Sequence, residues 1–143
     1  PLLTPLTRLC ELIIKDKKEA KSTQISELKE LDKKIMKQFP LQGIALAQNL
    51  SLDMFKYVNS QFGDLADYLK TWDNDKAEKV NSLENAIDQI DRHLNDFLLS
   101  CETGTLSIIA LQNYSKILRG TKDIERIGDY AENLISFYKQ INE

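Results

Sequence analysis

The chain of 143 residues contains little of what β-sandwiches, disulfide frameworks and histidine-rich metal sites require. Five glycines and three prolines are too few for the many turns of a sandwich or barrel. Two cysteines, Cys10 and Cys101, show neither metal-ligand spacing nor a disulfide framework. One histidine cannot form a histidine-rich metal site, and no serine or cysteine is placed to serve as its nucleophile. No run reaches the roughly 18 apolar residues of a membrane span.

Charge is distributed unevenly along the chain. Residues 1–40 carry nine Lys and Arg against six Asp and Glu, whereas the remainder carries ten against sixteen. An acidic body behind a basic leader lacks the concentrated positive face that nucleic-acid binding requires, so we expect no nucleic-acid partner. With 42% hydrophobic residues, the chain can bury one continuous core.

Apolar residues recur at alternating three- and four-residue spacing through most of the chain, which is the period of an α-helix. Turn formers interrupt this pattern after Trp72 and after Glu102. Short connections between long helices place them antiparallel. The sequence therefore predicts an all-α fold, an up-down-up antiparallel three-helix bundle with helices at about 42–71, 75–102 and 105–141. Its predicted core contains Leu83, Ile87, Ile90, Leu94, Ile117, Ile124 and Ile127.

The leader, residues 1–40, differs in kind from the bundle, residues 41–143. Residues 1–14 are largely apolar and are followed by Lys15, Lys17, Lys18 and Lys21. An apolar stretch before a basic one is typical of the cytoplasmic end of a membrane helix. An N-terminal helical extension that packs on the bundle explains the same residues equally well. Because the chain begins at Pro1 without a Met, we interpret it as part of a longer protein.

Two pairs of carboxylates stand out on the predicted second and third helices. Glu84 and Asp88 are four residues apart, as are Glu125 and Asp129, so each pair stacks on one helix face at a cost of roughly 0.2–0.5 kcal/mol. A hard cation bound between carboxylates would convert that repulsion into coordination. These four residues are the candidate metal ligands, and a turn at 102–104 would place Glu84 level with residue 122.

The alternative for the same carboxylates is a solvated face. Asp88 has Arg92 four residues later and Asp129 has Arg126 three residues earlier, and each such pair contributes a few tenths of a kcal/mol. If Ile124 and Ile127 are core residues, Glu125 and Asp129 lie on the outward half of their helix. The spacing of the carboxylates therefore leaves metal binding and a simple ion-paired surface both open.

Residues 123–133, Asp-Ile-Glu-Arg-Ile-Gly-Asp-Tyr-Ala-Glu-Asn, resemble the signature of the PhoU family of helical regulators of phosphate uptake. Residues 84–91, Glu-Asn-Ala-Ile-Asp-Gln-Ile-Asp, resemble the pattern of the family's second helix. The resemblance implies a non-catalytic regulator with surface metal clusters, usually of iron or zinc, held at these acidic motifs. Tyr130 departs from the family, which usually has a His there.

Residues 31–47 resemble the segment that joins the last membrane helix to the PhoU-like domain in bacterial sodium/phosphate cotransporter family proteins. This resemblance implies a regulatory domain on the cytoplasmic face of the plasma membrane, whose partner is the membrane-embedded transporter domain of the same chain. The alternative is a free-standing PhoU-type adaptor. Full PhoU proteins carry two three-helix repeats and this sequence has one, so such an adaptor would need two chains to pair as a homodimer. A metal-dependent enzyme is least favoured, because no cleft with a general base is evident.

Overall fold

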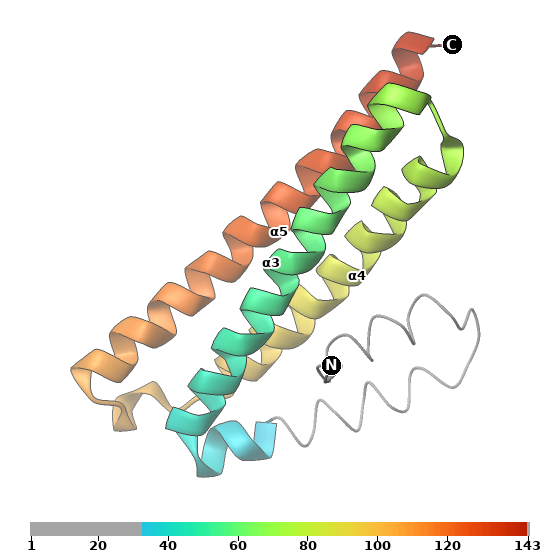
Figure 1. Ribbon diagram of the computed structural model, residues 1–143. Coiled ribbons are helices and arrows are strands. Elements are labelled where there is room, and N and C mark those ends of the chain that lie inside the picture. Colours follow the sequence, from blue (N-terminus) through green and yellow to red (C-terminus); the bar gives the residue numbers. More distant parts are fainter. Residues whose placement is uncertain (1–32, 143) are drawn as a thin grey trace.

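The computed structural model describes residues 33–142, which form an elongated bundle of helices. The long helices are α3 (Pro40–Thr71), α4 (Asn74–Leu99) and α5 (Ile108–Asn142), and a 3-10 turn, η1 (Thr103–Thr105), precedes α5. Figure 1 shows α3 and α5 running in the same direction with α4 antiparallel to both. The predicted all-α class and up-down-up arrangement are therefore confirmed.

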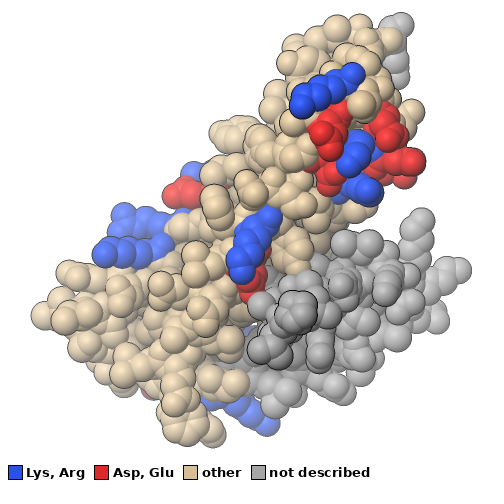
Figure 2. All heavy atoms as spheres, in the orientation of Figure 1, with Lys and Arg blue, Asp and Glu red and all other residues tan. Residues whose placement is uncertain are grey.

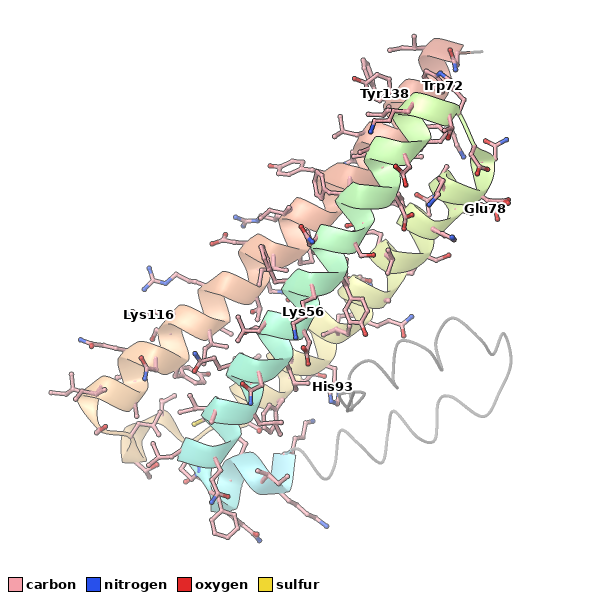
Figure 3. The ribbon with its side chains drawn as sticks, in the orientation of Figure 1. Lys56, Trp72, Glu78, His93, Lys116 and Tyr138 are labelled. Atoms are coloured by element: carbon pink, nitrogen blue, oxygen red, sulfur yellow. The ribbon has the colours of Figure 1, made fainter. Side chains whose placement is uncertain are left out.

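The connection between α3 and α4 is short and has aromatic support. α3 ends where Trp72 adopts a left-handed conformation with φ of 55° and its N–H donates to the carbonyl of Tyr68, and non-glycine residues adopt that conformation rarely. The Trp72 ring packs edge-on against Tyr68 and Tyr138, with ring centroids 5.5 and 6.4 Å apart. Asp73 caps α4 by accepting from the N–H of Asp75 at 2.9 Å. The rings thus hold this end of the bundle together (Figure 3).

The core runs the length of the bundle in three adjoining clusters of buried side chains. Four of the predicted core residues are buried: Ile87, Ile90, Leu94 and Ile117. Leu83 and Ile124 are half-buried, and Ile124 packs against the central cluster. The helical period thus identified most of the interior correctly.

α5 presents a different edge of its apolar surface to the core than the sequence pattern predicts. Ile127 is 40% exposed, so its assignment to the core is wrong, and Gly128 beside it is buried. A Cβ built on Gly128 would lie 2.7 Å from Oε2 of Glu84, so the missing side chain lets α5 approach α4. Two apolar stripes lie side by side on α5, and helical spacing alone cannot tell which of them faces the core.

The connection between α4 and α5 is longer than the predicted turn at 102–104. α4 ends at Leu99 and α5 begins only at Ile108. The hydroxyl of Tyr114 donates to the carbonyl of Leu98 at 3.0 Å, and this bond helps fix the pairing of the two helices. The prediction that Glu84 lies level with residue 122 is wrong, because Gly128 lies opposite it. The pairs Leu98–Tyr114 and Asp91–Lys122 show that the first turn of α5 extends past the end of α4. Figure 3 accordingly shows Glu78 towards the end of the bundle that carries Trp72 and Tyr138.

The described part of the predicted leader packs on the bundle. Residues 33–38 are helical, and Met36 is completely buried in the cluster that contains Ile44 and Leu94. A Cβ on Gly43 would lie 2.8 Å from the sulfur of Met36, so Gly43 admits this close contact. Residues 1–32, including the apolar stretch and its lysines, lie outside the described residues. Among residues 33–142, no helix is long and apolar enough to cross a membrane.

Candidate metal centre

Three carboxylates from two helices come together on the α4–α5 side of the bundle. Glu84 of α4 and Asp129 and Glu132 of α5 each place one oxygen so that these oxygens lie within 4.8 Å of one another. Glu84 is 7% exposed, Glu132 is half-buried and Asp129 is exposed. The group is therefore open to solvent on one side and backed by the core on the other.

A hydrogen bond from α3, on the core side of the cluster, positions the Glu84 side chain. Nε2 of Gln61, on α3, donates to Oε2 of Glu84 at 3.1 Å and to the carbonyl of Val80 at 3.2 Å. Gln61 is completely buried, so its amide has a fixed position. Gly128 provides the space for the Glu84 carboxylate, since a Cβ there would lie 2.7 Å from Oε2. A glycine inside a helix costs about 1 kcal/mol relative to Ala, and this contact is its structural reason.

Burial and crowding make the central carboxyl group a weaker acid. The pKa of Glu84 is raised to about 7, first by burial and then by the neighbouring charges of Glu132, Asp129 and Glu125, while the hydrogen bond from Gln61 opposes the shift. The pKa of Glu125 is also raised, chiefly by burial and by Asp91, with Lys122 opposing. Negative charge is thus costly at this site when no cation offsets it.

The four predicted ligands divide between this cluster and its surroundings. Glu84 and Asp129 belong to the cluster. Asp88 instead binds Arg92 at 2.6 Å, as the alternative of an ion-paired face predicts for that residue. Glu125 is half-buried and adds its charge to the field at Glu84. The sequence spacing predicts an ion pair between Arg126 and Asp129. In the structure Nη1 of Arg126 instead lies 3.8 Å from Oδ1 of Asp123.

Glu132 is the member of the cluster that sequence reasoning missed. It follows Asp129 by three residues, so both project from the same side of α5. The signal was present in the segment Asp-Tyr-Ala-Glu at 129–132. The four-residue spacing of Glu125 and Asp129 instead indicated the neighbour of Asp129 on its N-terminal side. Asp91 was also missed; it is 3% exposed and pairs with Lys122 of α5.

The donor set fits a divalent metal ion. Three carboxylates supply the oxygen ligands that hard cations take, and zinc also accepts Asp and Glu oxygens. The amide oxygen of Gln61 is buried without a hydrogen-bond partner among the described residues, which adds an unsatisfied acceptor behind the cluster. Glu84, Asp129 and Glu132 would hold the ion, and its charge would join α4 to α5.

Comparison with known proteins agrees with this helical framework. A family model described as PhoU domain matches residues 52–137. No curated protein and no solved structure matches the chain. The matched range includes Gln61, Gly128 and all three clustered carboxylates. Because the match spans more than half of the chain, from α3 to α5, the chain belongs to the PhoU domain family.

Proposed function

We propose that this chain is the regulatory, non-catalytic domain of a bacterial sodium-dependent phosphate transporter, attached at the cytoplasmic face of the plasma membrane. Its membership of the PhoU family supports a role in phosphate-related regulation. The proposed partner is the membrane-embedded transporter domain of the same chain. The resemblance of residues 31–47 to a transporter connector motivates this choice over a free-standing adaptor.

One packing contact favours a connector that can transmit a change in the bundle. Met36 lies within residues 31–47 and is completely buried. It belongs to the same core cluster as Ile44 of α3 and Leu94 of α4, so this part of the connector packs into the bundle. Packed side chains transmit displacements because protein interiors are as dense as organic crystals. A change in the packing of α3 and α4 would therefore alter the direction in which the chain enters the bundle.

A divalent cation at Glu84, Asp129 and Glu132 is the proposed regulatory ligand, with iron or zinc as the first ions to test. The ion would remove the repulsion among the three carboxylates and tie α4 to α5. Through the hydrogen bond from Gln61 to Glu84, the same site contacts α3. All three helices of the bundle thus meet at one point, and this meeting point is the observation that carries the proposal.

Thermal unfolding tests the metal site. Ferrous iron under anaerobic conditions, zinc, manganese or magnesium at one hundred times its Kd would add about 2.7 kcal/mol to the free energy of unfolding. Asp129→Asn and Glu132→Gln should abolish this gain. Asp88→Asn is the matched control, since Asp88 is held by Arg92, and it should keep most of the gain. If no ion shifts the wild-type melting temperature at millimolar concentration, the carboxylates are a solvated face.

The transporter assignment needs the complete gene and an uptake assay. The coding region upstream of Pro1 should contain several hydrophobic spans. Cells that express the complete protein should take up phosphate with a dependence on sodium, and Asp129→Asn should change the rate without changing the amount of protein in the membrane. A gene that encodes Met directly before Pro1 and no hydrophobic span would contradict the proposal and favour the free-standing adaptor.

A further inference from the structure

One end of the bundle exposes large apolar side chains from all three long helices. Figure 1 shows that α3 and α5 begin at this end and that α4 finishes there, next to η1. Five of its side chains are more than half exposed: Phe39, Leu41, Leu99, Ile108 and Ile109, at 55, 65, 62, 78 and 73%. Leu41 and Ile109 line one groove of about 250 Å³ between α3 and α5. Large apolar side chains that gather on one part of a soluble surface mark an interaction site.

The same end is basic, although the bundle as a whole is acidic. Residues 33–49 and 98–119, which we call the basic end, carry five Lys and Arg against one acid, Glu102. Residues 50–97 and 120–142 carry eight against fourteen, and in Figure 2 the largest group of acidic side chains lies at the opposite, upper end. The five cations are all exposed: Lys33, Lys34, Lys37, Lys116 and Arg119. None of them forms an ion pair within the part of the chain that the structure describes, so their charge is available to a partner.

The direction of α5 brings its first cation within reach of whatever the apolar tip touches. Lys116 follows Ile108 by eight residues, which is about 12 Å along a helix, and Figure 3 shows it close to the beginning of α5. Side chains on a helix tilt towards its N-terminus, so Lys116 leans towards Ile108. Attraction between charges extends over about 10 Å at an ionic strength of 0.1 M. A surface in contact with Ile108 is therefore within range of the Lys116 charge.

An anionic lipid surface matches both the exposed apolar side chains and the excess of positive charge. Apolar side chains enter the boundary between headgroups and acyl chains, while Lys and Arg attract anionic headgroups. A second copy of the basic end would place like charges against one another. Cytoplasmic loops of membrane proteins are themselves rich in Lys and Arg, so the basic end would repel them as well. A nucleic acid binds chiefly through its phosphates and would leave the exposed Ile and Leu side chains in water.

We propose that the basic end docks on the anionic surface of a phospholipid bilayer, with Phe39 and Ile108 among the headgroups. Asp129 follows Ile108 by 21 residues, which is about 30 Å along α5, so the carboxylate cluster lies away from the negative headgroups. This contact orients the bundle on the membrane and is distinct from any membrane-spanning segment upstream. It does not depend on the transporter assignment, since a free-standing adaptor with the same basic end would dock in the same way.

Flotation of the full chain with lipid vesicles tests the apolar part of the contact. The wild type should bind vesicles that contain phosphatidylglycerol and phosphatidylcholine, and should bind vesicles of phosphatidylcholine alone at least tenfold more weakly. Ile108→Asn should weaken binding to the mixed vesicles by about tenfold, because the tip then inserts less apolar surface. Ile141→Asn is the matched control, since Ile141 is 61% exposed at the opposite end of α5, and it should bind like the wild type. Circular dichroism checks that each variant folds.

A pair of charge variants tests the basic part of the contact. Lys37→Glu combined with Lys116→Glu should weaken binding to the mixed vesicles by about tenfold or more, since each cation near an anionic surface contributes to the attraction. Lys70→Glu combined with Lys79→Glu changes the net charge by the same amount at exposed positions nearer the opposite end, and it should have little effect. An increase in ionic strength from 0.1 to 1 M should weaken wild-type binding, because salt screens the attraction.

Fluorescence quenching by lipids with brominated acyl chains shows which end of the bundle touches the bilayer. Trp72 is the only tryptophan of the chain and lies at the opposite end (Figure 3), so brominated lipid should leave wild-type fluorescence nearly unchanged and should quench the added signal of Ile108→Trp. Three results would overturn the proposal: a wild type that does not bind the mixed vesicles, equal binding by the two charge variants, or an unquenched Ile108→Trp. Each of them would leave the transporter assignment standing, because that assignment is decided by the upstream gene and by phosphate uptake.

Discussion

Gly128 provides the sharpest test of how α5 meets α4. A methyl group at this position would lie 2.7 Å from Oε2 of Glu84, 3.2 Å from Oε1 of Gln61 and 3.4 Å from Cδ1 of Ile87. Gly128→Ala therefore forces the Glu84 carboxylate away from Gln61. A methyl group on Gly120 of the same helix would have none of the described residues within 4 Å beyond its own helix backbone. Gly120→Ala is therefore a matched control.

The two substitutions should change stability in opposite directions. In an open helical position, Gly→Ala raises the free energy of unfolding by about 1 kcal/mol, and this gain is expected for Gly120→Ala. Gly128→Ala should receive the same gain but also incur about 1–3 kcal/mol of overpacking. Losing the hydrogen bond from Gln61 adds about 1 kcal/mol more. We expect Gly128→Ala to be about 2–4 kcal/mol less stable than Gly120→Ala.

Urea unfolding followed by circular dichroism, with a chelator present, measures this difference. Equal m values in both variants would show that the same surface is exposed on unfolding. If Gly128→Ala is stabilised as much as Gly120→Ala, then α5 does not approach Glu84 as described. The rotation of α5 that places Ile127 outside the core would be refuted with it.

Two further predictions concern the interior. Without metal, the free energy of unfolding should decrease as the pH rises from about 4.5 to about 7, because the folded state binds the Glu84 proton more tightly than the unfolded state does. The rise of the Glu84 pKa from the ordinary 4.5 to about 7 corresponds to a loss on the order of 3 kcal/mol. Glu84→Gln should flatten this dependence in urea unfolding measured from pH 5 to pH 8, and an unchanged slope would place the titrating group elsewhere. Ile90→Ala, at a site 2% exposed, should cost about 2–5 kcal/mol. Ile127→Ala, at 40% exposure, should cost less than about 1 kcal/mol at low protein concentration, and equal losses would contradict the assignment of the core face.

The sequence identified the helices because each of them carries a long apolar repeat with turn formers at its ends. Pro40 begins α3, as proline at the first turn of a helix does, and Ile87, Ile90 and Leu94 were placed in the core by spacing alone. Glu84 and Asp129 were selected as ligands, and the structure brings both into one cluster. These features depend on neighbours within one helix, which the chain specifies locally.

The relation between helices required the tertiary structure. The position of α5 along α4 sets which residue of α5 lies opposite Glu84, and the shift from residue 122 to Gly128 brings Asp129 and Glu132 beside it. The rotation of α5 about its own axis depends on whether Gly128 or Ile127 packs better in the interior. Two apolar stripes lie side by side on α5, so the sequence pattern does not decide between them. The sequence by itself therefore determined the helices and supplied the carboxylates. Packing between helices decided which carboxylates meet and which apolar stripe of α5 faces outward, because these two features depend on contacts between residues far apart in the chain.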